Sequence, residues 1–498
     1  MGTGLSMSPG KLSAIVASIV LAVAALLAGL YYSTFGTVHA PRVAAADFVL
    51  PDVTVITPRV ERLTAQDVGI AGGRIERIGP AASLISPTAL MEYRGMYVLP
   101  GLFDMHMHFP PGNILHLTEH ALLLFIAHGV TGVRALGDGT GTSDLAAREA
   151  LAHGVPGPEM FTCGPFVAGT SALRWPNTII VHRPEEAEGI VDRIRAAGNV
   201  CIKAYEDLSP EKLRALREAT AKRGMAMPGH VPYGLDYVAG DVPEVQHYFG
   251  VPKPSALKRD HLIDRSFDWS SVDDARLDEV VEATLRNGTI NLPTLVSTSQ
   301  FLYFRDVATA RETPAARLLP RLYRDVVWDP HDGIAIWRGV DERISQIEDS
   351  HRKKLELTRR LFEAGAPLLI GTDAGQPFVP HGLSVHIEMR EFASAGIPIE
   401  DVWAIATWKA ADMIGRPDLG RVRAGASAFL IVFREDPTKD LAALSAIEAV
   451  IIGGKLYRRA DLDRALTAWE EHFDDPLFDW ISTRVARAAL DKAVLRNY

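Results

Sequence analysis

Leu99-Pro100-Gly101-Leu102-Phe103-Asp104-Met105-His106-Met107-His108 is an apolar run that ends in two histidines one residue apart. A run of this kind is typical of a buried β-strand. Residues i and i+2 of a strand point to the same face, so His106 and His108 present two imidazole rings together at its carboxyl end. Two such rings can chelate one metal ion. A His-x-His pair also arises by chance, so its meaning depends on the rest of the chain.

Apolar segments alternate with amphipathic segments along residues 96–416. We predict strands at 97–104, 132–136, 159–163, 200–205, 226–230, 244–247, 289–296 and 367–373. This alternation implies a parallel sheet, and eight units predict an α/β fold with a closed (β/α)8 TIM barrel. The region exceeds the roughly 250 residues of an ordinary barrel. The excess lies mainly in 297–347, which we interpret as a helical excursion on the rim where substrates enter.

Short strand-like runs flank this region on both sides. Two alternating runs around Gly72-Gly73 predict a β-hairpin within residues 47–95. Strand character returns at 417–460, which we expect to complete the same unit. We therefore predict one small discontinuous β-sandwich domain, followed by a helical tail at 461–498.

The first 46 residues contain an uncharged apolar segment at 12–30, preceded by Lys11. Its about 19 residues would span roughly 28 Å as a helix, enough for a bilayer core. The length favours a retained membrane anchor through residues 12–32, because the apolar part of a cleaved signal is shorter. Small residues near Val38-His39-Ala40 keep a cleaved signal open, and a buried globular helix is the third reading. Under the first two readings the catalytic body is exported, either anchored in the membrane or secreted or periplasmic.

The overall composition excludes some classes of partner and site. The 498-residue chain has a net charge of −9 and no Lys/Arg run, so we predict no nucleic-acid binding. Cys163 and Cys201 belong to no Cys-x-x-Cys pair, which excludes a cysteine zinc site. We favour two buried free thiols, with a disulfide as the alternative if the domain is exported. A homo-oligomer is left open.

Four further residues lie at or beside the ends of later predicted strands: Lys203, His230, His247 and Asp373. The carboxyl ends of barrel strands face one mouth, so these residues should converge with the histidine pair. Lys203 lies in an apolar run, where a charged amine is costly unless it is paired or chemically altered. Any one of the six could be an ordinary polar strand end, but that reading is poor for all of them together.

These segments resemble the amidohydrolase superfamily. The stretch 99–108 resembles its opening signature, and Gly371-Thr372-Asp373-Ala374-Gly375 resembles its last-strand signature. Ile202-Lys203-Ala204-Tyr205, together with Gly229-His230-Val231-Pro232, is similar to the prolidase-like and imidazolonepropionase-related branch, which carries a carboxylated lysine. The resemblance covers about residues 48–458. Two departures are Gln246, where an acidic residue usually precedes the histidine, and Ser427-Ala428 in the closing strand.

The resemblance implies a binuclear metal site. His106, His108 and Asp373 would hold one divalent ion, and His230 and His247 the other. Lys203, carboxylated by CO2, would bridge them. Zinc suits these ligands, with manganese, cobalt or iron left open. Two such ions lower the pKa of a bridging water and polarise a carbonyl.

Three residues receive roles beyond metal binding. Asp373 is the expected general base and then the proton donor to the leaving amine. Tyr205 is either an oxyanion donor or a packing residue. His386 either orients the substrate or caps a helix after the last strand.

The predicted function is hydrolysis of an amide bond in a small molecule, an N-acyl amino acid or a dipeptide. The departure at Gln246 is expected to alter the support of His247. The same site would serve an esterase, a lactonase or a phosphotriesterase. A catalytically silent, membrane-tethered binding module is the alternative of another class, and the complete ligand set argues against it.

Overall fold

A curled parallel sheet carries the histidine pair in the computed structural model, which describes residues 9–84, 86–113, 115–169, 175–258, 262–333 and 337–492. The strands pair in the orders β6-β7-β8 and β10-β9-β11-β12-β13-β14. They are β6 (Leu102–Met107), β7 (Val130–Ala135), β8 (Glu159–Thr162), β9 (Phe166–Ala168), β10 (Thr178–Ile180), β11 (Lys203–Ala204), β12 (Pro228–Gly229), β13 (Glu244–Gln246) and β14 (Ile290–Leu292).

Backbone hydrogen bonds join the two sets of strands at both ends. Val200 N donates to Thr162 O across 2.9 Å, which links β8 to the segment that leads into β11. At the other end the segment 367–373 lies between β14 and β6, because Leu369 N donates to Asn291 O (2.9 Å) and Met105 N to Ile370 O (3.0 Å). The eight predicted segments therefore follow one another around the sheet in sequence order.

Helices connect these strands, as the alternating pattern predicts. Ser209 begins α5 by accepting from Lys212 N, and Asp273 begins α7 by accepting from Arg276 N. Side-chain oxygens in this position satisfy backbone N–H groups that have no partner within the helix. The helices are α2 (Leu117–Ala127), α3 (Ser143–Ala152), α4 (Ala187–Ala196), α5 (Pro210–Lys222), α6 (Leu262–Phe267), α7 (Asp274–Asn287), α11 (Ile344–Glu363), α12 (Leu383–Ser394), α13 (Ile399–Ala404) and α14 (Ala410–Met413).

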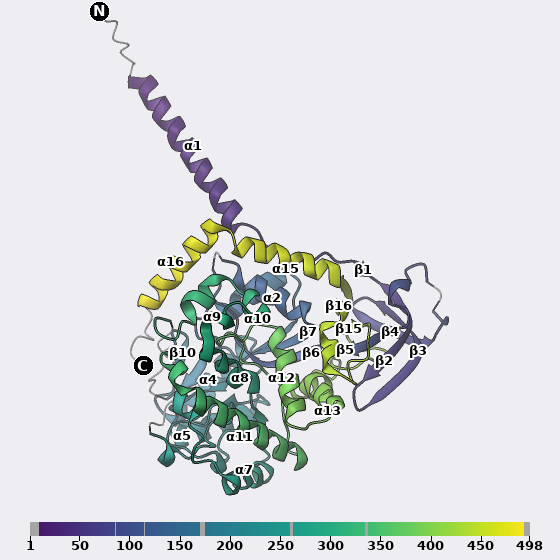
Figure 1. Cartoon of the computed structure of the whole chain (residues 1–498), viewed down its shortest axis with the longest axis vertical. Helices are drawn as coiled ribbons and strands as arrows, with labels where there is room; N and C mark the ends of the chain where they lie inside the picture. The colour runs from purple at the N-terminus through teal and green to yellow at the C-terminus, as the bar shows by residue number, and fades with distance from the viewer. Residues whose placement is uncertain are drawn as a thin grey trace, which may run out of the picture.

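A second sheet combines strands from both ends of the chain, in the order β1-β17-β16-β15-β5-β2-β3-β4 (Figure 1). Strands from the segments 47–95 and 417–460 pair in this sheet, and the turn between β3 and β4 lies at Gly72-Gly73. The eight strands form a single sheet around their own apolar core, not two separate layers. They are β1 (Ala45–Ala46), β2 (Phe48–Thr57), β3 (Glu61–Ala71), β4 (Arg74–Pro80), β5 (Tyr97–Pro100), β15 (Leu430–Phe433), β16 (Ile447–Ile452) and β17 (Lys455–Arg458).

The strand predicted at 97–104 is divided at Gly101. Its first half, β5, pairs with β15 in the second sheet, and its second half, β6, pairs with β7 in the curled sheet. A Cβ at Gly101 would lie only 2.0 Å from Thr131 Oγ1, so only glycine fits this point. The second sheet therefore extends to Pro100, beyond the boundary predicted at residue 95.

The excursion after β14 is helical, as predicted, and consists of short pieces. Phe301, Phe304, Trp328 and Phe378 form an apolar cluster beneath it. The pieces are α8 (Leu295–Gln300), α9 (Val307–Ala310), α10 (Pro314–Arg317), 3-10 helices at Phe301–Asp306 and Val340–Arg343, and a π-helix at Leu322–Val327.

The N-terminal segment forms α1 (Pro9–Phe35), which projects from the body in Figure 1. Phe35 at its end packs against Phe478 of α16 (Pro476–Lys492), with ring centroids 5.8 Å apart. The chain enters α16 from α15 (Arg459–Phe473), so the predicted helical tail is present. Among the helices that the structure describes, none combines the length and apolar character needed to cross a bilayer. The side chains of residues 12–16, 27 and 32 in the predicted anchor lie outside the described set.

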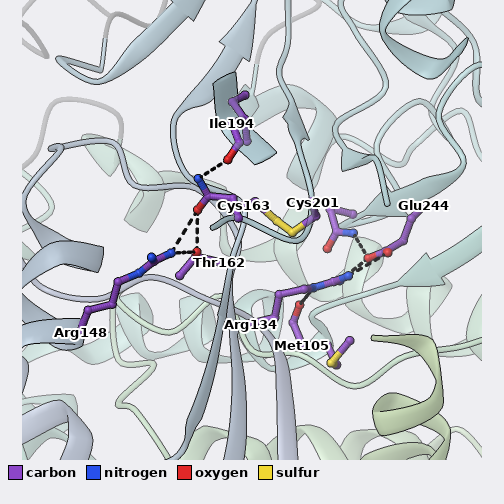
Figure 2. The surroundings of a disulfide bond; sticks show 10 residues. Met105, Arg134, Arg148, Thr162, Cys163, Ile194, Cys201 and Glu244 are labelled. Carbon is purple, nitrogen blue, oxygen red and sulfur yellow. Dashed lines mark hydrogen bonds and ion pairs between the residues drawn. A yellow bond between two sulfur atoms is a disulfide. The ribbon is translucent and has the colours of Figure 1, made fainter. Parts of the chain in front are cut away.

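Cys163 and Cys201 form a disulfide, with Cα atoms 4.4 Å apart (Figure 2). The prediction of two free thiols is therefore wrong, and the alternative is observed. The reason is the hydrogen bond between Val200 and Thr162, which places the residues that follow them side by side.

Removing both sulfurs as Cys163→Ala/Cys201→Ala should lower the free energy of unfolding by about 2 to 4 kcal/mol, because the crosslink closes a long loop in the unfolded chain. The sequence separation is 38 residues. Urea unfolding followed by circular dichroism measures the change. Titration of two free thiols in the denatured, unreduced wild type would contradict the crosslink.

Candidate metal centre

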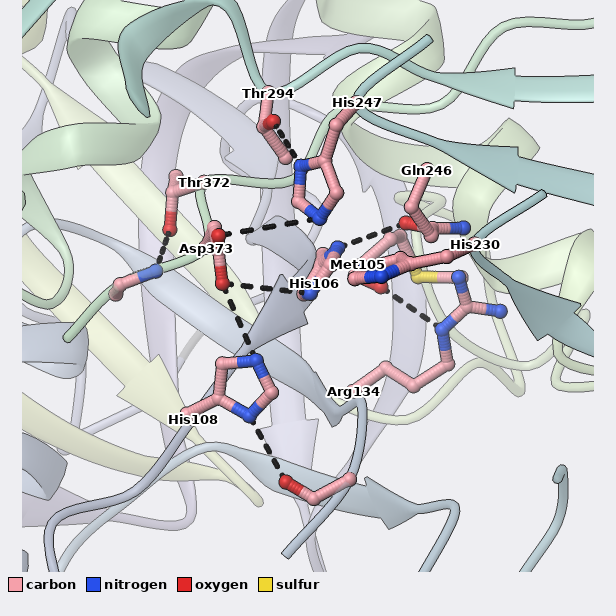
Figure 3. A network of polar contacts seen from close by, with 12 residues as sticks. Met105, His106, His108, Arg134, His230, Gln246, His247, Thr294, Thr372 and Asp373 are labelled. Atoms are coloured by element: carbon pink, nitrogen blue, oxygen red, sulfur yellow. Dashed lines mark hydrogen bonds and ion pairs between the residues drawn. The ribbon is translucent and has the colours of Figure 1, made fainter. Parts of the chain in front are cut away.

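The six residues predicted to converge line one cavity at the carboxyl ends of the curled sheet, and Figure 3 shows the four histidines and Asp373 among them. Asp373 is at the centre of the contacts. Its Oδ1 lies 3.2 Å from His108 Nε2 and 3.5 Å from His106 Nε2, and its Oδ2 lies 3.9 Å from His247 Nε2. The two carboxylate oxygens thus face different histidines, as a bridging ligand would.

His230 and Lys203 complete the group on its other side. The His230 ring lies 5.0 Å from the His247 ring, centroid to centroid. Lys203 lies on β11 and is only 1% exposed. Its Nζ has no hydrogen-bond partner among the described residues. A buried amine without a partner is costly, so this position calls for a group that the protein atoms do not supply.

Each histidine of the site uses Nδ1 to contact an oxygen behind it. Because these oxygens accept, each Nδ1 carries the proton and each Nε2 keeps a lone pair directed into the site. The acceptors are Gln246 Oε1 for His106 (2.8 Å), Gly137 O for His108 (2.9 Å), Glu206 Oε1 for His230 (2.9 Å) and Thr294 Oγ1 for His247 (2.7 Å).

Further hydrogen bonds fix the orientation of these acceptors. Gln246 Nε2 donates to Glu244 Oε1 across 2.9 Å, which turns Oε1 of Gln246 toward His106. Glu244 is itself held by a buried ion pair with Arg134 (Figure 2). The expectation that Gln246 would affect His247 is therefore wrong. Gln246 supports His106, and it is Thr294 Oγ1 that supports His247.

The electrostatics keep the imidazoles of His106, His230 and His247 neutral. Burial lowers the pKa of His106 and His230 well below the usual range, and the Lys203 charge adds to it. Burial lowers the pKa of His247 to about 3. It also lowers the pKa of Lys203 to about 7, against the opposing effect of Asp373. For Asp373, burial acts to raise the pKa, but the contact with His108 and the electrostatic effects of His247, His108 and Lys203 outweigh it and lower the pKa.

This donor set fits divalent metal ions. Ligand atoms of His106, His247 and Asp373 lie within 4.8 Å of one another. Neutral imidazoles with inward lone pairs and an ionised carboxylate are the ligands that zinc and related ions take in proteins. The orphaned Lys203 Nζ beside them fits a further, anionic ligand on that nitrogen.

Positive φ angles mark the strand ends that carry the site. His247 (φ 60°), Thr294 (φ 47°) and Asp373 (φ 60°) all adopt the left-handed conformation. Non-glycine residues there carry a backbone cost of about 1 kcal/mol or more and cluster at functional sites. Here the conformation ends each strand abruptly and directs its side chain toward the centre of the sheet.

The other two predicted site residues, Tyr205 and His386, lie in different places. Tyr205 lines the cavity, its ring 4.9 Å from that of His230 and 4.5 Å from that of Phe166. His386 does not join the site, because its Nε2 donates to His128 O (2.7 Å) at the end of α2. A residue missed from the sequence, His381, lines the cavity and contacts His108 O through Nε2 (2.8 Å). No strand or spacing signal distinguishes it.

The site opens into a cavity of about 290 Å³ with largely aromatic walls. The rim excursion supplies much of this wall. The aromatic lining residues are Phe109, Phe166, Trp175, Tyr205, Phe249, Phe267, Phe301, Tyr323, Trp328 and Trp337. Such walls suit a small molecule with a large apolar part.

Comparison with known proteins supplies the family. The sequence profile of the amidohydrolase family matches residues 97–457. The chain belongs to this family. This amidohydrolase is 22% identical over 475 residues to a pterin deaminase from Rhizobium rhizogenes, a match that covers 88% of this chain and 98% of the relative.

Solved amidohydrolase structures share the fold. A bottromycin amidohydrolase superposes with a TM-score of 0.64 at 23% identity and covers 86% of this chain and 91% of its own. A Xaa-Pro dipeptidase superposes with a TM-score of 0.59 at 20% identity and covers 83% of this chain and all of its own. At these identities the likeness establishes the α/β fold alone.

Replacing Gln246 by Met should weaken divalent-metal binding about 10- to 100-fold, because His106 loses the acceptor that fixes its tautomer. Competition with a chromogenic chelator measures the affinity. Gln346→Met on α11 is the matched control, because Gln346 contacts Arg343 and does not line the cavity. Equal affinities in both variants would show that the Gln246 contact does not support the metal.

Proposed function

We propose that this amidohydrolase hydrolyses the C–N bond of a small-molecule amide, either an N-acyl amino acid or a dipeptide, at a centre of two divalent ions, with zinc as the favoured metal. The observation that carries the proposal is the set of four histidines whose Nε2 lone pairs converge with Asp373 and Lys203. His106, His108 and Asp373 would hold one ion, and His230 and His247 the other.

A carboxylated Lys203 is part of this proposal. Its Nζ is buried without a partner among the described residues, and burial lowers its pKa to about 7, which favours the neutral amine that reacts with CO2. The resulting carbamate would place two anionic oxygens between the two sets of histidines. It would also remove the cost of an isolated buried ammonium.

When bound, the ions would polarise the substrate carbonyl and lower the pKa of water. Side chains of the protein would carry out the proton transfers and stabilise the developing charge. Asp373 lies at the centre of the cluster, where its carboxylate accepts a proton from water and returns it to the leaving amine. The Tyr205 ring lies beside that of His230, and its hydroxyl would donate a hydrogen bond to the carbonyl oxygen as negative charge develops there. The aromatic walls exclude other water.

Hydrolytic deamination of a heterocycle is the second candidate. The match to the pterin deaminase over nearly its full length favours it. The chemistry is again hydrolysis at a C–N bond, so the same residues would serve. Esters, lactones and phosphotriesters belong in the same screen, because the metal centre supports them as well.

Metal content tests the centre directly. The wild type should hold about two divalent ions after incubation with zinc and bicarbonate, and Lys203→Ala should lose metal because the bridging ligand is gone. Elemental analysis of the purified proteins measures this. Lys212→Ala on α5 is the control. A wild type without metal would remove the mechanism and favour a binding module.

The same purified proteins are then tested for hydrolysis of amides, esters and heterocyclic amines. Asp373→Asn should lower kcat about 10²- to 10⁴-fold, the usual contribution of a general acid–base residue. Turnover of heterocyclic amines alone would replace the amide assignment with deamination. The oligomeric state stays a prediction.

We also propose that the enzyme is exported. The Cys163–Cys201 disulfide supports this, because structural disulfides persist in oxidising compartments. Alkylation of intact cells, followed by fractionation and mass spectrometry, should find the protein outside the cytoplasm with the pair oxidised. The membrane or soluble fraction separates a retained anchor from a cleaved signal. Cytoplasmic protein with both cysteines alkylated would contradict export.

A further inference from the structure

A second buried lysine lines the same cavity as the metal centre. Lys354 lies on α11, is 2% exposed, and extends toward α8. Its Nζ donates to Thr298 Oγ1 across 2.9 Å and lies 5.5 Å from the centre of the Trp269 ring. Apart from histidines, Lys203 and Lys354 are the cationic side chains among the described residues that line the cavity.

The protein leaves the Lys354 charge largely uncompensated. An ammonium has three donors, and the hydroxyl of Thr298 is the one acceptor that the described residues offer it. Glu388 is the nearby carboxylate, but it already accepts from Leu295 N (3.0 Å) and Val296 N (2.6 Å). No ion pair forms between Glu388 and Lys354 within 4.0 Å. Burial lowers the pKa of Lys354 to about 7, although Glu388 acts to raise it.

The position of Lys354 relative to the metal centre is set by α8. Thr294, at the start of this helix, accepts from His247 Nδ1, and Thr298 lies one turn further on. Four residues of helix rise about 6 Å. Both threonines and Ser297 line the cavity, so a polar strip leads from the metal ligand His247 to the ammonium. Aromatic side chains line the same cavity.

We propose that Lys354 is the specificity-determining residue that binds a carboxylate of the substrate. In an N-acyl amino acid the carboxylate lies two bonds from the amide nitrogen, so a cation in the wall of the same cavity can meet it when the amide is at the metal centre. The aromatic walls then hold the acyl group. The inference rests on the proposed function for the scissile bond, and it adds that a free carboxylate next to that bond is required.

The test compares N-acyl amino acids with their C-terminal carboxamides, which have the same shape without the charge. Wild type should prefer the acids. Lys354→Met should raise KM for the acids about 10- to 100-fold, the range expected for loss of a charged hydrogen bond, with kcat and the carboxamides little changed. Lys353→Met is the matched control, since this lysine contacts Trp269 O and Asp349 and does not line the cavity.

Melting temperatures show whether each variant is folded. If Lys354→Met does not fold, the same comparison is made with Lys354→Gln. Equal losses for acids and carboxamides would make Lys354 a structural residue and overturn the proposal. So would a wild type that does not distinguish them.

Calorimetric binding of the same acids separates this failure from failure of the proposed function. If wild type hydrolyses no amide, the proposed function fails. Lys354 keeps its assignment only if the acids still bind wild type and Lys353→Met, and bind Lys354→Met at least 10-fold more weakly. Absence of binding by every acid would overturn the carboxylate assignment as well.

Discussion

The outward hydrogen bond from each histidine is the interaction on which the site depends. A buried imidazole could carry its proton on either nitrogen, and only one choice leaves a lone pair at the centre. At all four histidines an oxygen accepts from Nδ1, so Nε2 keeps its lone pair at the centre. The accepting oxygens belong to Gln246, Gly137, Glu206 and Thr294. The Arg134–Glu244 ion pair holds Glu244, which in turn accepts from Gln246 and fixes its orientation. The histidines are therefore oriented before any metal binds. Such preorganisation lowers the cost of assembling a centre from distant segments.

The sequence predicted the six converging residues because each stands at the end of an apolar run, and a parallel curled sheet brings all such ends to one side. It also predicted the discontinuous second sheet and the helical excursion. Local patterns could not show which oxygen stands behind each histidine. The Gln246 contact depends on which face of β13 meets β6, and Thr294 depends on a left-handed turn that no propensity predicts.

Three further differences have the same origin. The cysteines pair because Val200 hydrogen bonds to Thr162, a contact between distant segments. His386 looks equivalent to His381 in the sequence, yet α12 directs it to the end of α2 while His381 meets His108. Lys354 falls within an ordinary amphipathic helix pattern. Only the packing of α11 on α8 turns it into a buried charge beside the metal centre.

Gly101 has a consequence for how the two sheets are joined. β5 and β6 are one continuous extended segment, with a single glycine between them wedged against Thr131. There is no linker between them, and any side chain larger than hydrogen at this point would collide with Thr131. The chain passes directly from the second sheet into the segment that carries His106 and His108. Neither sheet can therefore be excised as a separate unit without cutting the segment that carries this histidine pair.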